Sequence, residues 1–96
     1  MQKGEKNDRE LHVNHPNFSV ANGIVKSGKR YVYSEAGRRY EVLCLDVWEE
    51  RGLICLQLQV LKSDPKVYSL PAGEIIDVSI NVEGIGFQGM WFLRDA

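Results

Sequence analysis

The chain has 96 residues, of which 44% are hydrophobic and 26% are charged, and its formal net charge is -1 at pH 7. These values are typical of one globular domain, and the near-neutral charge argues against a strongly basic nucleic-acid-binding protein as the first interpretation. No apolar run approaches the ~20 residues of a membrane-spanning helix, and residues 1–10 lack the apolar core of a secretory signal. We therefore expect a cytoplasmic protein with no membrane partner.

Residues 1–16 form a polar segment rich in Lys, Glu, Asp and Asn. Such a segment has too little apolar surface to offset the entropy of ordering, so we expect a flexible N-terminal tail ahead of a single β-barrel domain over 17–96. His12 and His15 lie in this tail, three residues apart. A helix would bring them to one metal ion, but the adjacent Pro16 disfavours a helix, and no metal site is predicted.

Strict two-residue alternation of apolar side chains marks the centre of the chain, at 53–61 and again at 75–82. This pattern is typical of strands with one buried face. Turn signals recur every ~8–12 residues, as in small all-β domains. We expect strands at 30–34, 39–48, 53–61, 67–70, 75–82 and 87–93. The predicted fold is all-β, a small antiparallel barrel of five or six strands, SH3-like or similar, because closure hides strand edges.

The alternation also predicts a register for the central hairpin. A four-residue loop at 49–52 sets Leu45 opposite Leu56, whereas a loop shorter by one residue sets Leu45 opposite Gln57. We therefore favour the four-residue loop. It places on the buried face Leu43, Leu45 and Val47, and on the outer face Cys44, Cys55 and Trp48.

The chain shows no catalytic constellation, and we predict no enzymatic activity and no cofactor. Two cysteines make neither a disulfide framework nor a zinc-binding spacing, so both thiols are expected to be reduced. Cys44 and Cys55 would be diagonal neighbours in the predicted hairpin. A disulfide there needs strained geometry, so a redox pair is the weaker interpretation.

A basic and aromatic segment at 26–40 is the strongest functional candidate, because it has five basic residues and one acidic residue. Arg and Lys neutralise phosphates, and tyrosine rings stack on bases. We predict a non-enzymatic binding module that contacts nucleic acid, or a nucleic-acid-bound assembly, through Lys26, Lys29, Arg30, Tyr31, Tyr33, Arg38, Arg39 and Tyr40. The alternative is structural: the tyrosines belong to the core and the charges form a solvated edge.

A second function also fits the sequence: a protein–protein adaptor or small inhibitor protein, with a homodimer as one form. The C-terminal segment holds more large apolar groups than one buried face can accept, and excess apolar surface marks interfaces. The interface residues would be Trp48, Phe87, Met90, Trp91 and Phe92.

One short stretch has a family resemblance. Asp77-Val78-Ser79 followed by Gly84-Ile85-Gly86-Phe87 resembles the DxSxxG stretch of PilZ domains, which are barrels that bind cyclic di-GMP. The spacing differs by two residues, with Val82 where the family has glycine, and adjacent Arg38-Arg39 stands in place of the family's RxxxR pair. The resemblance covers about eleven of the 96 residues. It implies a degenerate PilZ-like nucleotide-binding barrel as a third alternative.

Overall fold

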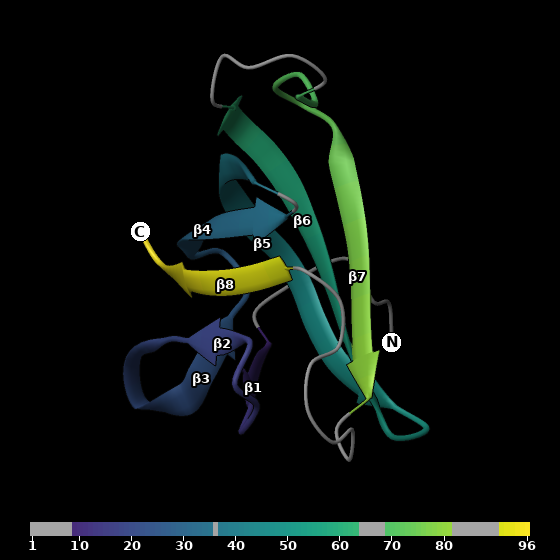
Figure 1. Ribbon diagram of the computed structural model, residues 1–96. Coiled ribbons are helices and arrows are strands. Elements are labelled where there is room, and N and C mark those ends of the chain that lie inside the picture. Colours follow the sequence, from purple (N-terminus) through teal and green to yellow (C-terminus); the bar gives the residue numbers. More distant parts are fainter. Residues whose placement is uncertain (1–8, 36, 64–68, 82–90) are drawn as a thin grey trace.

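The computed structural model describes residues 9–35, 37–63, 69–81 and 91–96, and this part of the chain is built from strands (Figure 1). A short 3₁₀ turn, η1 (Ala21–Gly23), follows the second strand. No helix among the described residues has the length and hydropathy to cross a membrane. The strands in chain order are β1 (Glu10–His12), β2 (Phe18–Ser19), β3 (Ile24–Lys26), β4 (Arg30–Glu35), β5 (Arg38–Glu50), β6 (Leu53–Ser63), β7 (Ile75–Asn81) and β8 (Trp91–Asp95).

The strands form a six-stranded sheet in the order β2-β8-β4-β5-β6-β7 and a two-stranded sheet of β1 and β3. The all-β class is confirmed, but the predicted barrel is wrong, because the described strands leave the two sheets unclosed. The β2–β8 pair is parallel, whereas the other strand pairs described are antiparallel. Figure 1 shows β8 running across the direction of β7, so the sheet turns strongly between its ends and covers the core by twisting.

Four of the expected strands correspond to β4, β5, β6 and β7, with ends that differ by at most two residues. Of the strand expected at 87–93, only 91–93 is described, and it belongs to β8. Of the strand expected at 67–70, Ser69 and Leu70 are not in a strand, and the rest lies outside the described residues.

The hairpin between β5 and β6 has a two-residue loop. Arg51 and Gly52 both have positive φ, of 53° and 79°, which is the backbone of a type I′ turn. Glu50 pairs with Leu53 directly before and after this loop. The predicted four-residue loop is wrong because an arginine in the left-handed region is not a turn signal that sequence rules favour.

The pairing of β5 with β6 shifts by one residue around Leu45, which has no partner on β6. Val42 and Cys44 before the shift are buried, and Val47 after it is buried too. Leu43 and Leu45, which were expected in the core, are only half-buried, and Cys44 was wrongly placed outside. A one-residue shift exchanges the two faces of a strand, so a single alternation cannot describe both halves of β5.

The core lies on the inner face of the six-stranded sheet, where the even positions of β6 and β7 meet the inward side chains of β4, β5 and β8. Val25 of the two-stranded sheet also joins it. Its members are Val13, Val25, Tyr31, Tyr33, Tyr40, Val42, Cys44, Val47, Ile54, Leu56, Leu58, Val60, Val78, Ile80 and Leu93.

Residues 9–16, which composition assigned to a flexible tail, are docked. β1 pairs antiparallel with β3, and the side chains of Val13 and His15 are buried. Arg9 forms an ion pair with Asp46 of β5 at 3.1 Å. The ordered domain therefore includes residues 9–16, because two apolar or aromatic side chains and one ion pair hold this segment to the sheet.

Candidate nucleic-acid interface

Strand alternation divides the basic and aromatic segment between the two faces of the sheet. Tyr31 of β4 has no exposed surface, and Tyr33 and Tyr40 are 3% exposed. Arg30 and Arg39, each next to one of these tyrosines, are exposed on the opposite face. The structural interpretation of the tyrosines therefore holds, and a role for their rings in stacking on bases is not supported.

The buried tyrosines anchor neighbouring segments through their hydroxyl groups. Tyr31 Oη accepts a hydrogen bond from the backbone N–H of Lys26 at 2.8 Å, and Tyr40 Oη accepts one from that of Leu70 at 3.2 Å. The rings of Tyr33 and Tyr40 stack with their centroids 6.3 Å apart. Burial raises the pKa of Tyr33 well above its ordinary value. These side chains bind the β4–β5 hairpin to the rest of the fold.

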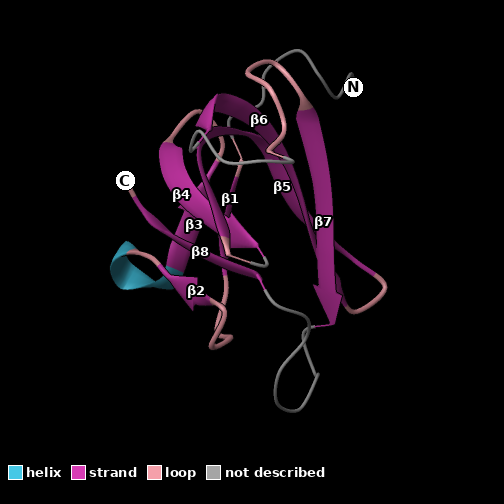
Figure 2. Cartoon of the chain, turned by 45° about the horizontal axis from the view of Figure 1, so that its top comes forward, coloured by secondary structure: helices cyan, strands magenta, loops and turns pink. Residues whose placement is uncertain are grey.

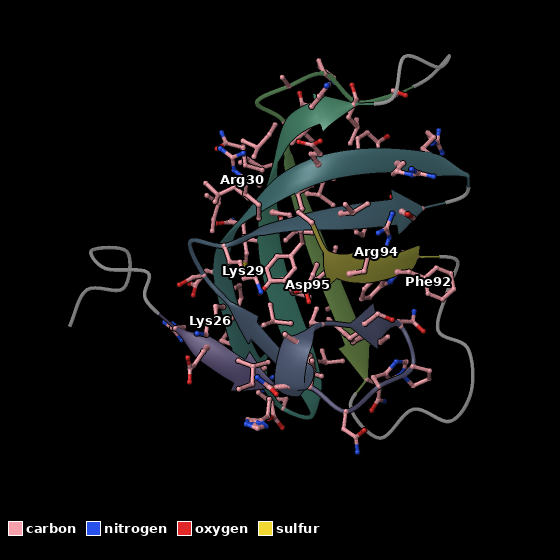
Figure 3. The ribbon with its side chains drawn as sticks, turned by 90° about the vertical axis from the view of Figure 1, so that its left-hand side faces the viewer. Lys26, Lys29, Arg30, Phe92, Arg94 and Asp95 are labelled. Carbon is pink, nitrogen blue, oxygen red and sulfur yellow. The ribbon has the colours of Figure 1, made fainter. Side chains whose placement is uncertain are left out.

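The two lysines of the predicted site lie apart from its arginines. Lys29 Nζ is 3.0 Å from Asp95 Oδ1 and 5.3 Å from the ring centroid of Tyr31. The hydrogen bond to Asp95 raises the pKa of Lys29. Lys26 is exposed on β3, in the other sheet. In Figure 3, Lys29 lies beside Asp95, and Lys26 lies farther from Arg94 than Lys29 does. Lys29 therefore stabilises the C-terminal strand, and Lys26 belongs to a different surface.

The outer face of the six-stranded sheet carries a hollow, here called the basic groove, with a volume of about 360 Å³. Strand pairing brings its residues together from four adjacent strands. Val32 of β4 is opposite both Arg94 of β8 and Glu41 of β5, and Glu41 is opposite Lys62 of β6. The lining residues are Val32, Arg39, Tyr40, Glu41, Lys62, Ser63 and Arg94.

Positive charge dominates the basic groove. Arg39, Lys62 and Arg94 are exposed, and none of them forms an ion pair with another described residue. Glu41 is the acidic residue among those that line it. Arg30 adds a further exposed cation on the same face of β4, two residues before Val32. Unpaired cations that share a concave surface create a positive potential that attracts anions.

Two cations of the basic groove, Lys62 and Arg94, were missed by sequence reasoning. Arg94 reaches the groove only because β8 pairs with β4, a contact between distant parts of the chain that local patterns do not predict. The available signal was the alternation of faces along a strand: Arg94 follows the buried Leu93 and therefore faces outward. Arg38, which was predicted to join the site, is opposite Glu35 and does not line the groove.

The three described residues of the predicted protein interface do not form one surface. Trp91 is half-buried against Phe18, with ring centroids 5.5 Å apart. Phe92, the next residue, is 45% exposed on the outer face of β8, near Arg94 (Figure 3). Trp48 lies near the far end of β5, and its Nε1 donates a hydrogen bond to Glu50 at 3.1 Å. Phe87 and Met90 lie outside the described residues.

The two cysteines point to opposite faces of the sheet. Cys44 is buried in the core, and burial raises the pKa of its thiol to about 12. Cys55 is half-exposed and pairs in register with Trp48 on the outer face. Both thiols are free, and their positions are incompatible with the weaker interpretation of a redox pair.

Potential metal ligands are also dispersed in the described part of the chain, where no three His, Cys, Asp or Glu side chains gather. His12 is exposed at the end of β1, whereas His15 is buried and its Nδ1 accepts a hydrogen bond from the backbone N–H of Asn17 at 3.1 Å. The tetrapeptide at 84–87 that carries half of the PilZ resemblance lies outside the described residues.

Comparison of the chain with protein-family models, with curated protein sequences and with solved structures gives no match.

Proposed function

We propose that the protein is a non-enzymatic binding module that holds nucleic acid by its phosphate backbone in the basic groove. The observation that carries the proposal is the convergence of Arg39, Lys62 and Arg94 from three strands, without ion-pair partners among the described residues. Each cation that approaches a phosphate releases condensed counterions, which supplies sequence-independent binding energy.

The spacing of the cations favours a polymer over a single phosphate. Arg94 on β8 and Lys62 on β6 are separated by β4 and β5, which is three strand spacings, or roughly 14 Å across the sheet. Strand side chains stand roughly perpendicular to the sheet, so at this separation the two cations would meet different phosphate groups, which successive nucleotides of one strand supply. Arg39 on β5 lies between them and continues the same track.

An exposed aromatic ring beside the groove favours single-stranded over double-stranded nucleic acid. Phe92 and Arg94 are two residues apart on one strand, so their side chains leave the same face. Single-strand-binding surfaces combine cations for the backbone with aromatic rings on which unpaired bases stack. Phe92 takes the place in this proposal that the buried tyrosines cannot fill.

The test is fluorescence anisotropy with labelled single-stranded and double-stranded oligonucleotides over a range of salt concentrations. Arg94→Gln removes one groove cation, and we expect the slope of log K against log salt to become shallower by about 0.7. The double variant Arg39→Gln/Arg94→Gln should weaken binding at low salt about tenfold. Lys26→Gln is the charge-matched control, because Lys26 is exposed on the other sheet.

Two results would refute the proposal. One is a folded protein that binds neither oligonucleotide at low salt. The other is equal loss of affinity in Arg94→Gln and Lys26→Gln, which would mean that only the total charge matters and the groove has no role.

A further inference from the structure

The two ends of the six-stranded sheet differ in the length of their edge strands. β2 at one end has only two residues, Phe18 and Ser19. β7 at the other end has seven residues, 75–81, and among the described strands it pairs with β6 alone. Figures 1 and 2 both show β7 at the outer margin of the sheet. A long open edge is a template for pairing with another strand.

The residues of β7 themselves supply few of the devices by which proteins usually block an edge. It contains no proline and no lysine, and Asp77 is its one charged residue. Ile75 at its start is 43% exposed, and the side chains of Asp77 and Ser79 are exposed. Natural edge strands are commonly shortened, charged or interrupted, as β2 is by its length. β7 is therefore suited to pair with a further strand.

The backbone groups that face the open edge follow from the start of the β6–β7 ladder. The N–H of Val60 donates to the carbonyl of Glu74 at 2.9 Å, and the N–H of Gly73 donates to the carbonyl of Val60 at 2.7 Å. Gly73 has φ of 96°, as in a G1 bulge. Hydrogen-bonded pairs alternate along an antiparallel ladder. In the regular pairs after this bulge, the backbone N–H and carbonyl groups of Ile76, Val78 and Ile80 therefore point toward β6. The residues whose N–H and carbonyl groups face the open edge are then Ile75, Asp77 and Ser79.

We propose that this edge is a homodimer interface, in which β7 of one copy pairs antiparallel with β7 of a second copy, with Val78 opposite Val78. This register sets Asp77 of each copy opposite Ser79 of the other, and it sets Ile76 of each copy opposite Ile80 of the other. The inward apolar row of each copy then continues into that of the other. Each Asp77–Ser79 pair can exchange two backbone hydrogen bonds, so the centre of the interface contains about four.

Other symmetric registers fit less well. A shift by one residue sets inward side chains opposite outward ones and interrupts the apolar row. A register centred on Asp77 brings two like charges directly opposite each other, which destabilises cross-strand pairs. The register centred on Val78 avoids both problems and pairs all seven residues of β7, whereas a register centred on Ser79 pairs only residues 77–81. This self-complementarity favours a second copy over an unrelated extended peptide. No residue of the basic groove takes part, so the inference is independent of nucleic-acid binding.

Sedimentation velocity of the full chain without nucleic acid, at concentrations up to about 1 mM, tests the proposal. We expect a reversible monomer–dimer equilibrium. Ser79→Asp places a carboxylate opposite Asp77 twice and should weaken the dimer about five- to tenfold, whereas Ser79→Lys creates two opposite-charge pairs and should strengthen it by a similar factor. Far-UV circular dichroism and thermal unfolding check that each variant is folded.

Ser19→Asp and Ser19→Lys are the matched controls, because Ser19 is an exposed strand residue at the other edge of the same sheet. Both should leave the dimerisation constant unchanged. A wild-type protein that is monomeric at every concentration overturns the proposal, whether or not the edge then captures another chain. Equal effects of Ser79→Asp and Ser79→Lys overturn it as well, since the register centred on Val78 requires opposite effects.

Discussion

The docking of the N-terminal segment depends on a mostly buried carboxylate. The Asp46 side chain is 11% exposed, and its Oδ1 accepts a hydrogen bond from the backbone N–H of Val47 at 2.9 Å and contacts Arg9 Nε at 3.1 Å. Arg9 also exchanges hydrogen bonds with Ser27, the residue that follows β3. Removal of this carboxylate should therefore loosen β1 and β3 together.

The size of the effect follows from the number and burial of these bonds. Hydrogen bonds to charged groups contribute ~1.5–3 kcal/mol, and the Asp46 carboxylate accepts from two donors. We expect Asp46→Ala to lower the free energy of unfolding by about 2–3 kcal/mol, or the Tm by about 10–15 °C. Arg9→Gln should cost only about 1 kcal/mol, because the Arg9 side chain is 45% exposed and solvent screens its charge.

A double-mutant cycle measured by urea unfolding isolates the ion pair from other effects of each substitution. In the Asp46→Ala background, Arg9→Gln should have almost no further effect, so the two residues should be coupled by about 1 kcal/mol. Lys26→Gln, an exposed charge removal on β3, should show no coupling to Asp46→Ala. If Arg9→Gln costs the same in both backgrounds, the ion pair with Asp46 does not help to hold this segment to the sheet.

Two further predictions concern the hairpin and the buried thiol. Arg51→Asn should stabilise the protein by about 0.5–1 kcal/mol in chemical unfolding, because Asn-Gly is the preferred type I′ turn and Arg51 already has φ of 53°; destabilisation would contradict the two-residue loop. Burial raises the pKa of Cys44 from 9.0 to about 12, so its contribution to stability is complete below pH 9 and is lost as pH rises from 9 toward 12. Cys44→Ala should therefore flatten the decline in unfolding free energy over that range, and an unchanged slope would show that the thiol does not titrate in this way.

The alternation of apolar residues predicted the central strands because it reports a local property, the face to which each side chain points. It failed at Leu45, where one unpaired residue exchanges the faces of β5. Nothing in the local pattern marks that shift, since Leu43, Leu45 and Val47 are all apolar. The bulge becomes favourable only when β6 is in place, and that is a long-range contact.

The candidate site shows the same division between local and long-range information. The alternation of Arg30, Tyr31, Val32 and Tyr33 is a local signal that the arginine and the tyrosines lie on opposite faces, as the structural alternative held, but the predicted site grouped them together. The addition of Arg94 required the order β8-β4-β5. Composition failed for 9–16 in a different way, because an average over a polar segment conceals two buried side chains, Val13 and His15.

The open sheet connects the two proposals. A closed barrel would pair β7 with the strand at the other end, and its backbone groups would have no further partner. Because the described strands leave the sheet unclosed, the β7 edge and the basic groove on β8, β4, β5 and β6 occupy different parts of one surface. Pairing through β7 would leave both basic grooves of a dimer accessible. Two grooves on one rigid sheet would then bind a long strand with higher apparent affinity than either groove alone, since the second contact becomes intramolecular.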